Sequence, residues 1–184
     1  MAKVITQVGR CRLRRKPNCF ASLAESIVHQ QLSLAAGQTI YKRVVALCNG
    51  RTLHPDSIAP LSDQQLRDAG LSWSKVAYLR DLAARLTDRR LRLRRLPNLT
   101  DDEVVAALTE VKGIGQWSAE MYLIFVLNRP DVFSPGDVGL QRAVKRLYGC
   151  NVHAARLKKV ITRWQPYRSV ASWYLWASLT ETIE

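Results

Sequence analysis

Residues 108–119 read Leu-Thr-Glu-Val-Lys-Gly-Ile-Gly-Gln-Trp-Ser-Ala and predict two helices joined by a tight Gly-Ile-Gly turn. Gly113 and Gly115 let the backbone bend sharply and approach a partner closely, because glycine has no Cβ. The bare N–H groups at the start of the second helix favour an anion, since the positive end of the helix dipole lies there. The turn therefore predicts an anion-binding site.

The chain is strongly basic. Its 184 residues contain 28 Lys and Arg against 15 Asp and Glu, a formal net charge of +13. Acidic residues are absent before Glu25 and between Asp137 and Glu181, and a further basic cluster spans residues 89–95. Such a surplus suits a polyanion, because each neutralised phosphate releases counterions. The expected anion is a nucleic-acid phosphate, although a solvated basic surface or an acidic membrane partner would fit the same charge.

The cysteines and histidines do not predict a metal site. Cys11, Cys19, Cys48 and Cys150 lack the spacing of zinc ligands or of a disulfide framework, so we expect reduced thiols. The N-terminus carries no secretion signal, and no apolar run approaches the roughly 18 residues of a membrane span. These observations predict an intracellular protein, in the cytoplasm or nucleoid or in a eukaryotic nucleus, with no membrane partner.

Helical periodicity runs through nearly the whole chain, and no convincing alternating strand occurs. Ser62 with Gln65 and Thr100 with Glu103 have the spacing of capping boxes that open helices. Leu140, Val144 and Leu147 recur on one face of a further helix. We expect an all-α fold class of about eight to ten helices.

Three more segments accompany the Gly-Ile-Gly turn. Residues 26–33 read Ser-Ile-Val-His-Gln-Gln-Leu-Ser, and residues 132–140 read Val-Phe-Ser-Pro-Gly-Asp-Val-Gly-Leu. Pro-Tyr-Arg-Ser at 166–169 precedes Trp176. In this order, the motifs resemble the helix-hairpin-helix DNA glycosylases, in particular a compact form of the 3-methyladenine DNA glycosylase II, or alkylpurine, branch. The resemblance covers about residues 4–180.

The resemblance implies one helix-hairpin-helix glycosylase domain over residues 1–184. Two helical lobes, approximately 20–130 and 1–19 plus 131–184, would flank a DNA-binding and base-binding cleft. The expected partner is double-stranded DNA that contains damaged bases, bound by a monomer.

Asp137, which ends the Ser-Pro-Gly-Asp loop, matches the catalytic aspartate of this family. Cleavage of an N-glycosidic bond builds positive charge on the deoxyribose, as in other glycoside hydrolyses. A carboxylate beside the sugar stabilises that charge and orients or deprotonates the attacking water. Taken alone, Asp137 would predict a helix cap more readily than a catalytic residue, because aspartate is favoured there; the surrounding motif reverses this preference.

Trp117 stands where bifunctional relatives hold a lysine that attacks the sugar. An indole has no nucleophilic amine, so the resemblance implies a monofunctional hydrolase that leaves an abasic site. Its substrates would be alkylated purines of the 3-methyladenine and 7-methylguanine type. The cysteine-rich iron–sulfur loop of several relatives is absent after Gly149, and we expect neither an iron–sulfur cluster nor zinc.

The base pocket is expected to contain aromatic side chains. Trp117 and Trp176 match pocket positions of the family, and electron-rich rings attract a cationic alkylated base. Phe20 and Tyr122 are looser candidates, which core packing would explain as well. Met121 stands where some relatives have a pocket tyrosine, so the range of accepted bases stays open.

The remaining expected contacts concern DNA and a cation. Gln31 matches the family's wedge, which fills the space of a flipped base, and Gln30 lies beside it; a plain polar turn is the alternative. The expected phosphate contacts are Lys112, Gly113, Gly115, Ser118 and Arg142. The backbone carbonyls of Thr109, Val111 and Ile114 match a site for Na⁺ or K⁺; no other cofactor is expected.

Two alternatives stay open. A glycosylase for a deaminated or oxidised purine would use the same aspartate, and the sequence does not separate the two substrate classes. A non-catalytic module that binds damaged DNA would use the same turn. Asp137 favours an enzyme, because binding alone has no need of an anion near DNA.

Overall fold

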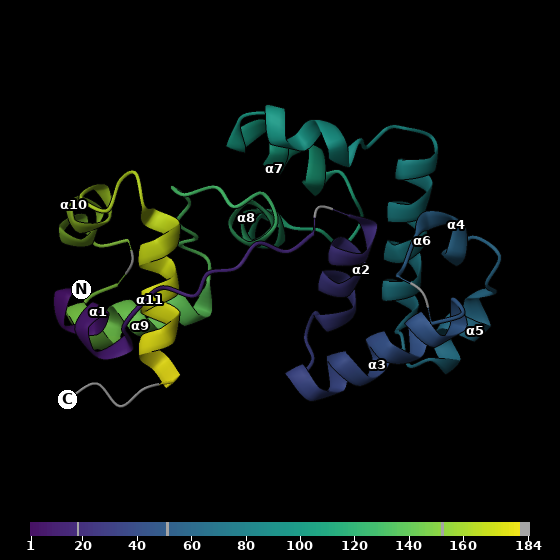
Figure 1. Cartoon of the computed structure of the whole chain (residues 1–184), viewed down its shortest axis with the longest axis horizontal. Helices are drawn as coiled ribbons and strands as arrows, with labels where there is room; N and C mark the ends of the chain where they lie inside the picture. Colours follow the sequence, from purple (N-terminus) through teal and green to yellow (C-terminus); the bar gives the residue numbers. More distant parts are fainter. Residues whose placement is uncertain (18, 51, 152, 181–184) are drawn as a thin grey trace. The chain divides into compact units, whose positions relative to one another are not determined.

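The computed structural model describes residues 1–17, 19–50, 52–151 and 153–180 (Figure 1). Every regular element in these ranges is a helix, which confirms the predicted all-α class. The described residues form eleven α-helices and one 3-10 helix, more than the expected eight to ten. Short helices account for the excess, because a four-residue helix such as α4 (Pro55–Ile58) is too short to show a period of 3.6 residues.

The chain divides into two compact units. Unit 1 contains residues 1–15 and 120–184, and unit 2 contains residues 16–119. The lobes expected from the sequence had boundaries near residues 19 and 130, whereas the division into units falls within α8 (Gln116–Phe125).

Unit 2 is built around the long helix α6. This helix contacts α2, α4 and α5, and α2 also packs on α3. Both predicted capping boxes form, at the starts of α5 and α7. Ile27, Leu79 and Leu108 are fully buried in the core. Besides α4, the helices of this unit are α2 (Phe20–His29), α3 (Leu34–Leu47), α5 (Asp63–Asp68), α6 (Trp73–Thr87), the 3-10 helix η1 (Leu93–Asn98) and α7 (Asp101–Thr109).

Unit 1 is built around the pair of helices α9 and α11. Leu140 and Val144 of α9 pack with Leu175 of α11 in one hydrophobic cluster, as the periodicity of α9 predicts. Helix α1 also packs on α11, where the Tyr174 hydroxyl donates a hydrogen bond to the Gly9 carbonyl at 2.9 Å. The helices that lie wholly in unit 1 are α1 (Ala2–Val8), α9 (Val138–Tyr148), α10 (Ala155–Thr162) and α11 (Arg168–Thr180).

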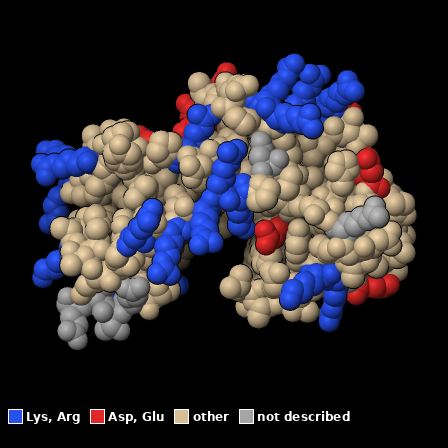
Figure 2. All heavy atoms as spheres, in the orientation of Figure 1, with Lys and Arg blue, Asp and Glu red and all other residues tan. Residues whose placement is uncertain are grey.

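The surface carries many Lys and Arg side chains (Figure 2). In unit 2 they gather most densely over the segment between α6 and α7, which contains the arginines of residues 89–95. Within the described ranges, none of the helices has both the length and the apolar character needed to cross a membrane.

Candidate functional site

The two glycines of the turn in unit 2 differ in their surroundings. Gly113 has φ 81°, and a Cβ there would lie 2.1 Å from Cδ2 of Tyr78. Only glycine fits this position, because both the left-handed backbone and the tyrosine ring exclude a side chain. At Gly115 a Cβ would meet no atom within 4 Å. The fold therefore requires Gly113, whereas space remains open beside Gly115 for a partner from outside the chain.

Asp81 of α6 anchors the backbone of the Gly-Ile-Gly turn to that helix. Its Oδ2 accepts hydrogen bonds from the Lys112 backbone N–H and from Arg85 Nε, both at 2.9 Å. Burial alone would raise the pKa of Asp81, but these hydrogen bonds and the nearby positive charges lower it overall. The ionised carboxylate thus ties the backbone of the turn to α6, while the Lys112 side chain stays exposed.

The turn after α2, which holds both wedge candidates, is fixed from two sides. Lys75 Nζ donates to the carbonyls of Val28 and Gln30, each at 2.7 Å. Burial lowers the pKa of Lys75. The Gln30 side chain donates to the Gly113 carbonyl at 2.7 Å and so joins this turn to the Gly-Ile-Gly turn. Gln31 is exposed and has φ 56°, a left-handed conformation that is unusual for a residue other than glycine.

A cavity of about 620 Å³ in unit 2 brings several predicted residues together. Its wall includes both wedge candidates, both glycines, Ser118 and the indole of Trp117, which is 46% exposed. His29 also lines the cavity. The residues that line it are Ser26, His29, Gln30, Gln31, Leu32, Tyr78, Gly113, Gly115, Trp117 and Ser118.

Asp137 in unit 1 caps the N-terminus of α9 and is only 8% exposed. Its Oδ1 accepts hydrogen bonds from the Leu140 backbone N–H at 2.7 Å and from Trp176 Nε1 at 2.8 Å. The indole of Trp176 is half-buried and stacks on Phe125 with 5.6 Å between the ring centroids. The carboxylate is therefore held in one orientation beside an aromatic surface. Asp137 therefore caps α9 and contacts Trp176 at the same time.

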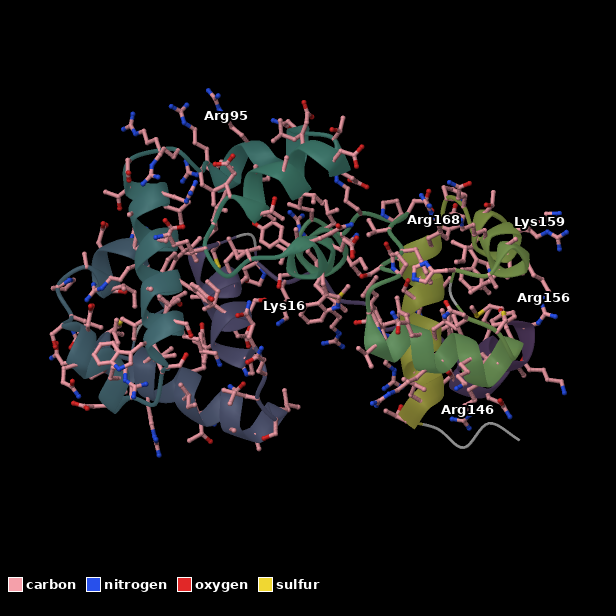
Figure 3. The ribbon with its side chains drawn as sticks, turned by 180° about the vertical axis from the view of Figure 1, so that it is seen from behind. Lys16, Arg95, Arg146, Arg156, Lys159 and Arg168 are labelled. Carbon is pink, nitrogen blue, oxygen red and sulfur yellow. The ribbon has the colours of Figure 1, made fainter. Side chains whose placement is uncertain are left out.

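Side-chain contacts fix the loop that carries Asp137 to α8 and to α11. Buried Ser134 donates its hydroxyl hydrogen to Glu120 of α8, and its carbonyl accepts from the Asp137 backbone N–H at 3.2 Å. Arg168, at the start of α11 (Figure 3), forms a two-pronged ion pair with Asp131 at 2.7 and 2.9 Å. This ion pair lowers the pKa of Asp131, since the hydrogen bond from Arg168 outweighs the effect of burial.

Gly139 is a site residue that sequence reasoning missed. A Cβ at this position would lie 3.0 Å from Asp137 Oδ1 and 3.0 Å from Trp176 Cδ1. The absence of a side chain therefore lets the indole reach the carboxylate. Glu120 and Asp81 were also missed, because no local motif marks a residue whose partner lies far away in the chain.

The other predicted site residues lie elsewhere. Phe20, at the start of α2, is 3% exposed and is absent from the wall of the Trp117 cavity. Tyr122 is 4% exposed, while Arg142 is exposed on α9.

At the expected cation site, the Val111 carbonyl accepts a hydrogen bond from the Ile114 N–H at 3.0 Å. That oxygen keeps a second lone pair for a cation, so the residues fit the expectation, which stays a prediction.

Comparisons with known proteins agree with this architecture. The chain is 42% identical to a DNA-3-methyladenine glycosidase structure from Bacillus halodurans, with a TM-score of 0.85, over 96% of this chain and 82% of that one. A Schizosaccharomyces pombe 3-methyladenine DNA glycosylase in complex with abasic DNA is 26% identical, with a TM-score of 0.82, over 100% and 92% of the two chains.

Two curated relatives are longer than this chain. The Bacillus subtilis protein YfjP is 34% identical over 170 residues, and the Saccharomyces cerevisiae DNA-3-methyladenine glycosylase is 38% identical over 135 residues. These matches cover 88% and 69% of this chain, but 58% and 46% of the relatives. The model of the HhH-GPD superfamily base excision DNA repair protein matches residues 24–166, most of the chain. The chain therefore belongs to the HhH-GPD superfamily of base excision DNA repair proteins.

Proposed function

We propose that this chain is a monofunctional DNA glycosylase that hydrolyses the N-glycosidic bond of alkylated purines in double-stranded DNA and leaves an abasic site. One observation carries the proposal: Asp137 Oδ1 is held by the Leu140 N–H and by Trp176 Nε1 in a largely enclosed position. Membership of a base excision repair family and the names of the relatives support the same activity.

The proposed reaction places Asp137 beside the deoxyribose. As the bond between C1′ and the base breaks, its electron pair leaves with the base and positive charge develops on the sugar. A base methylated at N3 or N7 carries a positive charge, so the departing pair neutralises it and no acid has to protonate it. The carboxylate stabilises the sugar cation and accepts a proton from the water that adds to C1′.

Unit 2 supplies the proposed recognition. The N–H groups of the Gly-Ile-Gly turn would bind a phosphate, and the open space at Gly115 allows its close approach. Gln31, exposed on a fixed turn, would enter the duplex as the wedge. The exposed indole of Trp117 offers a face for a cationic base and has no amine for a Schiff base.

The proposed enzyme works as a monomer and uses no cofactor in the chemical step. The carbonyls of Thr109, Val111 and Ile114 would hold a monovalent cation, whose positive charge would add to the attraction of the turn for a phosphate. Replacing Na⁺ and K⁺ by a bulky organic cation of equal ionic strength should then weaken duplex binding.

A panel of duplex oligonucleotides tests the proposal. The panel contains 7-methylguanine, hypoxanthine, 8-oxoguanine or no lesion, with methylated genomic DNA as the source of 3-methyladenine. We expect release of the methylated bases, with strand cleavage only after alkali. Release of hypoxanthine or 8-oxoguanine alone would support the other-lesion alternative. Tight binding without any abasic product would contradict catalysis, and strand cleavage without alkali would contradict the monofunctional mechanism.

A further inference from the structure

Unit 2 has a second concave region, at the end of the unit where α6 leads into η1. This groove has a volume of about 780 Å³, and its wall comes from the start of α2, from α4 and from the segment after α6. Its floor is apolar: the half-buried side chains of Leu86 and Leu93 line it, beside the buried side chains of Phe20, Pro55 and Leu91. Four arginines line its rim: Arg89, Arg92, Arg94 and Arg95.

The positive charge of the rim is not neutralised within the protein. All four rim arginines are exposed, and in the part of the chain that the structure describes no carboxylate forms an ion pair with them. Asp88 pairs with Arg90 instead, and the one acidic residue in the wall, Asp56, pairs with His54 at 3.2 Å. Figure 2 shows these basic side chains gathered on the surface, and Figure 3 shows Arg95 pointing away from the ribbon. The groove therefore fits an anionic partner.

The groove and the Trp117 cavity lie at opposite ends of the same helices. Phe20, at the first residue of α2, lines the groove, and His29, at its last residue, lines the cavity. Ten residues of helix separate these ends by about 15 Å. In α6 the order along the chain is reversed, with Tyr78, inside the helix, at the cavity and Leu86, near its C-terminal end, at the groove. The groove and the cavity are therefore two separate hollows of unit 2, with no lining residue in common.

The composition of the wall favours a peptide over a nucleic acid. Proteins that bind single strands stack bases on exposed aromatic rings, but Phe20, which is the only Phe, Tyr or Trp among the described residues of this wall, is 3% exposed. Guanidinium groups pair with carboxylates through two parallel hydrogen bonds, and Arg clusters are a recurring device for acidic peptides. We propose that the groove binds an acidic segment of a partner protein, with carboxylates on the arginine rim and apolar side chains on the floor.

Fluorescence anisotropy with a labelled peptide of alternating Glu and Leu tests this proposal. The groove variant carries Arg92→Glu, Arg94→Glu and Arg95→Glu. The control variant carries Lys158→Glu, Lys159→Glu and Arg163→Glu, all exposed on or just after α10 in unit 1, and has the same net charge. We expect the groove variant to bind the peptide at least about tenfold more weakly and the control less than about threefold, because specific pairs are lost only in the groove.

Two further measurements separate the outcomes. Circular dichroism and thermal melting would check that both variants fold. Base release from a methylated duplex would report the proposed enzymatic function independently. If both variants lost peptide affinity equally, the loss would come from the change in net charge and not from the groove, and the proposal would be overturned. It would also be overturned if the groove variant bound the peptide like the wild type. Loss of duplex binding by the groove variant, with the peptide displaced by undamaged duplex, would instead assign the groove to nucleic acid.

Discussion

The two units fix their functional segments by the same device but expose them to different degrees. In unit 2, Asp81 holds the backbone of the Gly-Ile-Gly turn, and in unit 1, Asp131 pairs with Arg168 to hold the loop that leads to Asp137. Both carboxyl groups have lowered pKa values. Trp117 of unit 2 is 46% exposed, however, whereas Asp137 of unit 1 is 8% exposed.

This difference suggests a division of labour. An exposed ring, an exposed glutamine and an open glycine suit recognition of a large partner. An enclosed carboxylate with two fixed donors suits chemistry, because a preorganised group needs no rearrangement as charge develops. In the proposed enzyme, unit 2 would bind and distort the DNA and unit 1 would cleave the bond.

The largest effect is expected from Asp137→Asn. Asparagine caps helices as well as aspartate does, and its oxygen can accept the same two hydrogen bonds, so the fold of unit 1 should be kept. The lost negative charge and base should lower the single-turnover rate of 7-methylguanine release by about 100- to 10,000-fold. A variant that released the base as fast as the wild type would remove Asp137 from the mechanism.

A smaller loss of rate is expected from Gly139→Ala. The new methyl group would press on Asp137 Oδ1 and the Trp176 ring, each only 3.0 Å away, and displace the carboxylate. A shift of this kind should cost about 10- to 100-fold in rate with little change in duplex affinity. Gly136→Ala is the comparison within the same loop: a Cβ there meets no protein atom within 4 Å, so it does not press on the carboxylate and should lower the rate less than Gly139→Ala does.

The two glycines of the turn should respond in opposite ways. Gly115→Ala should melt like the wild type but bind the duplex several-fold more weakly, because its methyl group fills the space proposed for a phosphate. Gly113→Ala should lose about 1–3 kcal/mol of stability through its positive φ and its contact with Tyr78. Thermal melting and duplex titration check both. Wild-type affinity in Gly115→Ala would argue against phosphate binding at this glycine.

The smallest expected effect concerns pH. The pKa values of Asp81 and Asp131 lie below the ordinary value of 3.8 in the folded protein, so the unfolded chain takes up protons first as the pH falls. Their stabilisation is therefore present above about pH 4 and is lost as the pH drops through the folded-state pKa values. In Asp131→Asn, the free energy of unfolding, measured with urea, should fall less steeply as the pH drops below about 4 than in the wild type. An unchanged slope in Asp131→Asn would contradict the assigned ion pair.

The sequence predicted features that depend on neighbouring residues and missed contacts between residues far apart in the chain. The capping boxes and the turn glycine Gly113 follow from residues within a few positions of one another. The supports do not: the hydrogen bond from Lys112 to Asp81 joins residues 31 positions apart, and that from Lys75 to Val28 joins residues 47 apart. No periodicity encodes such pairs, because they depend on how helices pack.

The same limit applies to aromatic residues. Phe20 and Trp117 are both apolar at helical spacing, yet one is 3% exposed and the other 46%. Burial is set by neighbours that come from distant segments, so the pattern alone does not separate a core ring from a ring that faces a cavity. The very short helices were not predicted for a related reason, since a single helical turn contains no repeat of apolar residues.

A paired measurement on one methylated duplex tests the division of labour most directly. The dissociation constant and the single-turnover rate at saturating protein are determined for Gly115→Ala and Asp137→Asn. We predict that Gly115→Ala binds more weakly but regains the wild-type rate at saturation. Asp137→Asn should bind within about twofold of the wild type and stay at least about 100-fold slow however much protein is added. If both variants lost affinity and rate in the same proportion, the assignment of binding to unit 2 and of chemistry to unit 1 would be wrong.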